Sequence, residues 1–163
     1  MKKAILIDSA AREVRAVEIP DNHITERLRE LIGGWICHAA TLPNGDTLYV
    51  DDEGLLKAST TFFQFKGRDD QPLAGNGVLV GRERINPRTG DYLGMTDVRS
   101  TVEQVTKLVT FQSLGDAKAW GRAHAHEAAT AITTVEKDGT TKREVLSTFG
   151  DLFGNLPEPE EAP

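Results

Sequence analysis

Short blocks of apolar residues, spaced as in strands and helices, organise the first third of the chain. The apolar run at 4–7 and the partly alternating run at 14–19 predict a β-hairpin. Over residues 22–32, apolar side chains recur at intervals of four, three and one, which predicts a helix with one apolar face. An Asp-Asn pair at its start offers an N-cap, and a Gly-Gly pair after it ends the helix.

The middle of the chain predicts further strands joined by turns. Residues 35–40 and 47–50 flank an Asn-Gly turn, and residues 60–65 are rich in Phe and Thr. The segment 77–81 is apolar between two glycines, which predicts a central strand. Residues 82–97 are rich in Arg, Pro and Gly, and they predict a long loop.

Two helices and a hairpin are predicted in the second half. Ser100 can cap a helix over 100–112 with Glu103 at the capping-box position, and an Ala-rich stretch predicts a helix over 114–129. An Asp-Gly pair between β-prone flanks predicts a C-terminal hairpin over 132–146. This order of elements predicts an α+β fold with a mainly antiparallel sheet built from hairpins.

The length of the chain, 163 residues, is typical of one domain. We therefore predict a single α+β domain over residues 1–154. Residues 155–163 are acidic and Pro-rich, which predicts a disordered tail.

Charge and cysteine content limit the partners and the cellular compartment that we expect for this chain. A net charge of −6 and a pI of about 5.2 argue against a strongly basic nucleic-acid binder, so we expect no nucleic-acid partner. The single cysteine, Cys37, allows no disulfide within the chain and fits the reduced thiol of a cytoplasmic protein. The apolar runs are too short for a secretion signal or a membrane span, so we expect no membrane association.

The densest charge cluster outside the tail is the acidic turn Asp51-Asp52-Glu53, with Asp46 one strand away. Carboxylates this close repel one another unless a cation or a basic partner lies nearby. The spacing departs from that of a calcium loop, which needs ligands at alternate positions. Asp46, Asp51, Asp52 and Glu53 therefore form a candidate interaction surface, and the alternative is a solvated turn between two strands.

Other motifs lack the geometry that their chemistry needs. Three glycines at 75–81 fit neither a dinucleotide-binding loop nor a P-loop, and they predict a turn and a bulge instead. His124 and His126 are two apart on a predicted helix and cannot share a metal ion. Cys37 and His38 are neighbours on a predicted strand and point to opposite faces, so they are no nucleophile–base pair. We predict no catalytic residue, no metal and no cofactor.

Phe62, Phe63 and Phe65, together with Trp35, are aromatic residues of the kind that stack on bases in single-strand binders. Basic residues flank them, but the chain as a whole is acidic. Alternating aromatic residues in a sheet are more often part of the core, and that is our expectation here.

Three segments share a pattern with a known family. Gly34-Trp35-Ile36 leads into a strand, residues 42–54 hold the turn and an Asp-Glu-Gly sequence, and residues 72–81 place Gly-Asn before an apolar strand. Together they resemble the domain-of-unknown-function family 3846, small proteins of phages, plasmids and other mobile elements. The resemblance implies a family-like core at residues 3–82. The helical and hairpin extension at 98–154 falls outside it and is predicted from its own sequence pattern alone. The resemblance implies no catalytic residue.

Two functions are open at this point. The first is a non-enzymatic mobile-element accessory protein, of a phage or plasmid, that binds a host protein and inhibits a host defence system. This context follows from the resemblance alone. The second is a small-molecule or nucleotide-binding domain, an enzyme included, whose site is assembled from distant loops. The sequence favours the first and leaves the host protein and the oligomeric state open.

Overall fold

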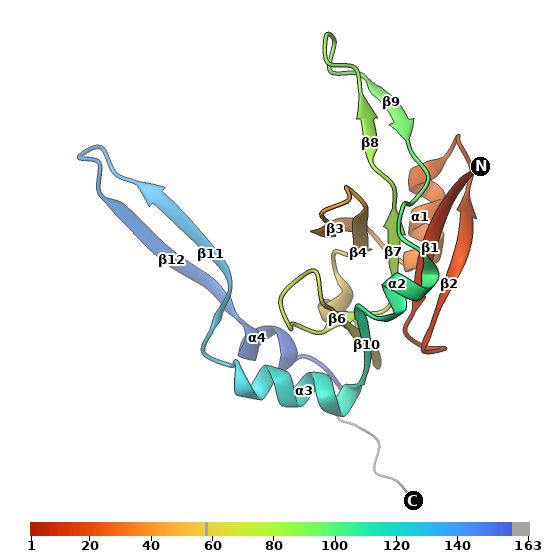
Figure 1. Ribbon diagram of the computed structural model, residues 1–163. Coiled ribbons are helices and arrows are strands. Elements are labelled where there is room, and N and C mark those ends of the chain that lie inside the picture. The colour runs from red at the N-terminus through yellow and green to blue at the C-terminus, as the bar shows by residue number, and fades with distance from the viewer. Residues whose placement is uncertain (58, 158–163) are drawn as a thin grey trace, which may run out of the picture.

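Five antiparallel strands form the central sheet, in the order β2-β1-β7-β4-β3 (Figure 1). The structure is a computed structural model that describes residues 1–57 and 59–157. The strands of this sheet are β1 (Lys2–Asp8), β2 (Glu13–Ile19), β3 (Ile36–Thr41), β4 (Thr47–Asp51) and β7 (Gly77–Val80). The predicted hairpin, the Asn-Gly turn and the central position of β7 are confirmed.

Helix α1 (Ile24–Ile32) covers one face of the central sheet. Its N-cap residue is His23, in the left-handed conformation with a φ of 58°. The predicted cap at the Asp-Asn pair is therefore wrong, and the Asp21 carboxylate pairs with the Met1 amine instead. Gly33 ends the helix at a φ of 88°, as predicted. The buried residues of this layer are Ala4, Leu6, Ile19, Leu28, Ile32, Val78, Val80 and Met95.

The opposite face of the sheet packs against helix α2 and a three-stranded sheet of order β10-β5-β6. These elements are α2 (Val102–Thr106), β5 (Thr61–Phe65), β6 (Leu73–Ala74) and β10 (Val109–Ser113). Strand alternation turns Phe63 and Phe65 toward the central sheet and Phe62 away from it. All three rings are buried, so they are core residues.

A third layer forms where helices α3 (Leu114–Ala123) and α4 (Phe149–Phe153) cover the far side of β5 and β6. The two helices approach closely at Gly121, where a Cβ atom would lie 2.3 Å from the Cβ of Phe153. The buried residues of this layer are Phe62, Ala74, Leu114, Ala117, Phe153 and Leu156.

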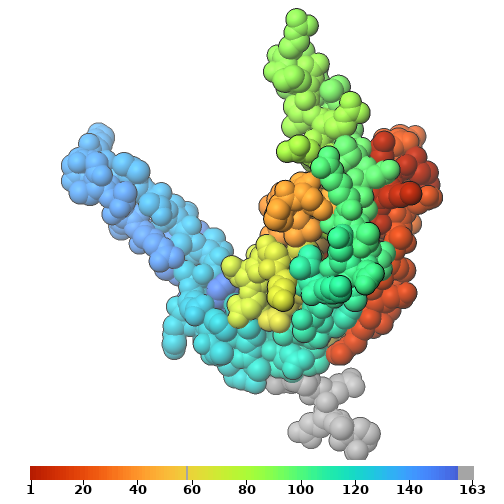
Figure 2. All heavy atoms as spheres, viewed as in Figure 1, coloured from red at the N-terminus to blue at the C-terminus, as the bar shows by residue number. Residues whose placement is uncertain are grey.

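Two hairpins project from these layers and diverge from each other (Figures 1 and 2). The first is formed by β8 (Glu83–Ile85) and β9 (Tyr92–Met95), and the second by β11 (Ala128–Val135) and β12 (Thr141–Thr148). Both carry large apolar side chains that are exposed. These are Ile85, Tyr92 and Leu93 on the first hairpin and Ile132, Val135, Val145 and Leu146 on the second.

The α+β class with mainly antiparallel sheets is confirmed, and three predicted segments need correction. The predicted loop at 82–97 contains the β8–β9 hairpin. The predicted helix at 100–112 ends at Thr106, because residues 109–113 pair with β5 as strand β10. The predicted helix at 114–129 ends at Ala123, and β11 begins at Ala128.

The packed structure extends beyond the predicted end of the domain at residue 154. Leu156 is buried against the third layer, so packed structure continues past residue 154. The remainder of the predicted disordered tail, residues 158–163, lies outside the described residues.

Candidate functional site

The four carboxylates of the predicted interaction surface lie in different environments. Asp46 is completely buried, with 0% of its surface exposed. Its carboxylate accepts hydrogen bonds from the backbone N–H groups of Arg99 and Ser100, at 2.8–3.1 Å, and from the Ser100 hydroxyl at 2.7 Å. The Asn44 amide donates a further bond at 3.2 Å. Asp46 thus ties the β3–β4 turn to the segment before α2, and it is not part of a surface.

The Asp51 carboxylate is also paired with a group of the same chain. Its side chain is 7% exposed and forms an ion pair with Lys57, with Nζ and Oδ2 2.6 Å apart. The same Lys57 ammonium donates to the Gly33 carbonyl at 3.2 Å. A Cβ on Gly34 would lie 2.5–2.6 Å from the Lys57 ammonium and the Asp51 carboxylate, so a larger residue there would displace the ends of these two side chains.

The exposed part of the acidic turn lies beside Trp35. The Asp52 N–H donates to the Trp35 carbonyl at 2.7 Å, which holds the turn against the start of β3. Asp52 and Glu53 are exposed, as are Trp35 (59%) and Leu56 (67%), which lies in the short helix η1 (Gly54–Leu56). We call Trp35, Asp52, Glu53 and Leu56 the Trp35 surface.

The exposed indole of Trp35 lies against a charged side chain. The Arg29 guanidinium lies 4.0 Å from the centre of the ring, in a cation–π contact from the last turn of α1. The segments on both sides are held by the hydrogen bonds to Gly33 and Trp35 described above. Trp side chains are frequent anchors of protein interfaces.

Cys37 lines a cavity of about 270 Å³ between the acidic turn and the C-terminal segment. Asp52 and Arg68 line the same cavity, together with Thr130 of β11 and Leu152 of α4. Burial raises the pKa of the Cys37 thiol, and the Asp52 carboxylate raises it further, while Arg68 acts in the opposite direction. A thiol that resists ionisation is a poor nucleophile, so this environment does not activate Cys37.

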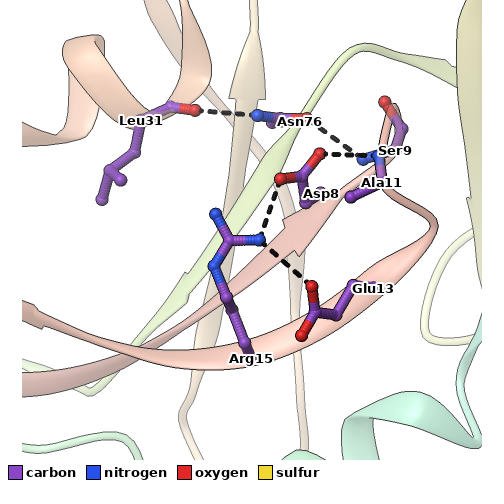
Figure 3. A network of polar contacts seen from close by, with 7 residues as sticks. All are labelled: Asp8, Ser9, Ala11, Glu13, Arg15, Leu31 and Asn76. Atoms are coloured by element: carbon purple, nitrogen blue, oxygen red, sulfur yellow. Dashed lines mark hydrogen bonds and ion pairs between the residues drawn. The ribbon is translucent and has the colours of Figure 1, made fainter.

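The glycine-rich segment at residues 75–77 connects α1 to the end of β1 through Asn76 (Figure 3). The Asn76 side chain donates to the Leu31 carbonyl at the end of α1 and accepts from the Ser9 N–H after β1, both at 3.1 Å. Gly75 has a φ of 77°, and a Cβ on Gly77 would lie 2.8 Å from the ring of Phe63. The turn predicted here is confirmed. The predicted bulge is wrong, because β7 pairs with β1 and β4 in an uninterrupted register.

The neighbouring network in Figure 3 closes the first hairpin. The Arg15 guanidinium pairs with Asp8 at 2.8 Å and lies 3.7 Å from Glu13. The second oxygen of Asp8 accepts from the Ala11 N–H. Arg15 lowers the pKa of the Asp8 carboxyl through its hydrogen bond, and the Ala11 N–H lowers it further. This cluster holds the β1–β2 turn.

The two histidines of the C-terminal half do not form a joint site. His124 stacks on Trp120, with ring centres 4.0 Å apart, and its Nδ1 lies 2.8 Å from the Trp120 carbonyl oxygen. His126 is exposed in the turn before β11. Over residues 1–57 and 59–157, no three His, Cys, Asp or Glu side chains are placed to hold a metal ion.

A cavity of about 740 Å³ lies along β1 and β2 next to the start of α2. Its lining is mainly apolar, from residues such as Val17, Val98 and Val102. Lys3, Glu18 and Arg27 add charged groups from three different elements. This volume is within the range of small-molecule pockets.

Sequence reasoning found the acidic turn and missed its neighbours. The sequence predicts Trp35 to be a core residue like Phe62, Phe63 and Phe65. In the structure the three Phe side chains are buried, but the Trp35 side chain is exposed. The signal available was its position after Gly-Gly, where the chain enters an edge strand. The exposed side chains of the β8–β9 hairpin were missed because a loop was predicted there.

Comparison with known proteins gives one match. A family model described as "Domain of unknown function (DUF3846)" matches residues 1–108, beyond the predicted limit of residue 82. The match therefore includes the Trp35 surface and the β8–β9 hairpin, and it stops before β10 is formed. Neither the search of curated proteins nor that of solved structures gives a match. In the described part of the chain, no helix is long and apolar enough to cross a membrane.

Proposed function

The chain belongs to the DUF3846 family, and from this starting point we propose that it is a non-enzymatic accessory protein that binds another protein through the Trp35 surface. The observation that carries the proposal is the exposed indole of Trp35, in contact with the Arg29 guanidinium, on a segment that is hydrogen-bonded to the exposed acidic turn. Large aromatic side chains supply most of the affinity in many interfaces, and charges at the rim select the partner.

The charges of this surface indicate the chemistry of the partner. Asp51 is neutralised by Lys57, so Asp52 and Glu53 carry the uncompensated negative charge. A complementary partner presents an apolar pocket for Trp35 and Leu56, with Lys or Arg side chains around it. Burial of the indole would then provide affinity, and the two carboxylates would speed association.

The wider setting comes from the family resemblance. Mobile-element proteins act on the machinery of a host, so we propose a host protein as the partner and a host defence system as its context. This part of the proposal rests on association and not on geometry.

The 740 Å³ cavity supports a second candidate, a small-molecule or nucleotide-binding domain. Native mass spectrometry of the protein purified from its host distinguishes the two. A retained small molecule would favour the cavity, and a retained protein would favour the Trp35 surface.

The proposal is tested by capturing partners from an extract of the natural host. Trp35→Ala should reduce the captured protein by at least about tenfold, the usual effect of losing an interface anchor. The double variant Asp52→Asn, Glu53→Gln should slow association and weaken its dependence on salt.

Each variant has a control elsewhere on the surface. Tyr92→Ala removes another exposed aromatic ring, and Asp69→Asn with Asp70→Asn removes two other exposed carboxylates. Both controls should capture the partner as the wild type does. Equal capture by the wild type and Trp35→Ala would show that this surface is not the interface.

A further inference from the structure

The β8–β9 hairpin separates its charges between its two faces. Arg82 and Arg84 are two residues apart on an extended segment, so their side chains lie on one face of the ribbon. Glu83 lies on the other face, where its carboxylate accepts a hydrogen bond from the Tyr49 hydroxyl at 3.2 Å. Gly94 is directly opposite Arg84 in the ladder, so no side chain covers the guanidinium from the neighbouring strand.

The tip of this hairpin is ordered and carries a third arginine. The Arg88 N–H donates to the Asn86 side chain, and the Asn86 N–H donates to the Asp91 carbonyl. The Asp91 carboxylate accepts from the Thr89 hydroxyl at 2.8 Å. Pro87 is exposed at the turn and restricts its backbone. The arginine side chains are thus presented by a ribbon of defined shape.

We infer that the β8–β9 hairpin binds duplex DNA. A two-stranded ribbon has the width to enter a groove of the duplex, and the outer part of this one projects from the rest of the molecule (Figure 2). Arg82, Arg84 and Arg88 are exposed along its length, as phosphate contacts require. The overall charge of −6 argued against nucleic acid, but it averages over the whole chain. The structure places three arginines on a projecting element with two acidic residues, Glu83 and Asp91.

This site is separate from the Trp35 surface and does not depend on the proposed function. An acidic protein would also attract three arginines. Duplex DNA fits better because the guanidinium groups follow the length of a narrow ribbon, where a groove offers phosphates on both sides.

The test measures binding of the full chain to a fluorescent 30-base-pair duplex by anisotropy, from 50 to 200 mM NaCl. Three phosphate contacts give a slope of about −2.7 for log K against log salt, a loss of roughly 40-fold over this range. The triple variant Arg82→Gln, Arg84→Gln, Arg88→Gln should bind at least about tenfold more weakly at 50 mM and show a flatter slope.

A matched triple variant in the other hairpin controls for net charge. Lys137→Gln, Lys142→Gln, Arg143→Gln removes the same three charges from exposed positions of β12 and its turn. It should bind DNA within about twofold of the wild type, and both triples should melt at the wild-type temperature. Competing polyglutamate should displace the duplex at least about tenfold less well than unlabelled duplex does, per charge.

Three results would overturn the inference. They are no binding of the wild type at 50 mM NaCl, an equal loss in the two triple variants, or polyglutamate competing as well as duplex DNA. The last would indicate an acidic protein as the ligand of this hairpin. Partner capture by the Trp35 surface is unaffected by any of them, so the two proposals fail separately.

Discussion

Asp46 and Asp52 are six residues apart and carry the same charge, yet the fold uses them differently. Asp46 is buried among backbone and hydroxyl donors, whereas Asp52 is exposed beside Trp35. Asp46 precedes β4 and Asp52 follows it, and the segment 99–100 covers only Asp46. Charge density in the sequence therefore located the region but not the individual roles.

Asp46→Asn should destabilise the protein by about 2–3 kcal/mol, because the amide group turns an N–H toward donors that need an acceptor. The affected donors are the N–H groups of Arg99 and Ser100 and the Ser100 hydroxyl. Urea unfolding measures the loss, and Asp69→Asn at an exposed position should change stability by less than about 0.5 kcal/mol. A loss below 1 kcal/mol for Asp46→Asn would show that water replaces these bonds.

Cys37 should react slowly with iodoacetamide at pH 8, because its raised pKa leaves little thiolate at that pH. Asp52→Asn removes a negative charge that raises this pKa, so the alkylation rate should increase. The rate is measured by mass spectrometry against a free cysteine peptide. An unchanged rate in Asp52→Asn would mean that burial alone protects the thiol.

At the scale of elements, local sequence patterns predicted those helices and strands correctly whose ends are determined by residues within or next to them. Two apolar runs define the β1–β2 hairpin, and the end of α1 and the C-terminal hairpin carry their turn residues with them. Strand β10 does not, because its partner β5 lies more than 40 residues earlier in the chain. The apolar spacing around Val105 continues past the end of α2, and only the pairing with β5 ends the helix.

The base of the β8–β9 hairpin depends on Gly81. A Cβ there would lie 2.1 Å from the Thr96 carbonyl oxygen and 2.5 Å from that of Asp97. Gly81→Ala should therefore cost about 3 kcal/mol, since both contacts are with backbone. It should also break the bonds between Arg82 and Thr96 at the base of the hairpin.

Gly115→Ala is the matched control for this prediction. Its Cβ would meet one atom, the Ser113 Oγ at 3.6 Å, in the first turn of α3. Alanine favours the helix, so stability should stay the same or rise slightly. Equal stability of Gly81→Ala and Gly115→Ala in urea would contradict the close approach at residue 81.

At the scale of the whole molecule, the family match and the packed core end at different residues of the chain. The match stops at residue 108, but β10, α3 and α4 supply a partner strand for β5 and most of the third layer. A chain ending at residue 108 would leave Phe62 and Ala74 without their covering helices. The family match thus covers part of the packed structure, and the later residues complete its core.

The fragment 1–108 should therefore fail to fold cooperatively and should bind a hydrophobic dye. Replacing residues 132–144 by Asn-Gly should instead leave the melting temperature within a few degrees. Ala131 and Val145 are paired in the ladder, so a two-residue turn can join them, and the third layer stays intact. A cooperative melt of the fragment 1–108 would show that the matched residues form a domain of their own.

Much of the fold was predictable from the sequence, but the site was predictable only in outline. Turn residues and apolar runs predicted the central sheet and its α1 layer. Trp35 is exposed and the β8–β9 hairpin projects because no other element in the described part of the chain covers them. Local sequence carries no signal for such an absence, because exposed and buried aromatic residues look alike until the layers are placed.

The two projecting hairpins have a consequence for hydrogen exchange. Their ladders are closed only between their own strands, so each can open without disturbing the layered core. Amide protons of β8, β9, β11 and β12 should exchange with deuterium far faster than those of β1 and β7. A ligand that binds to one hairpin would slow hydrogen exchange in that hairpin and leave exchange in the other hairpin unchanged. The exchange rates of each hairpin therefore show whether a ligand is bound to it.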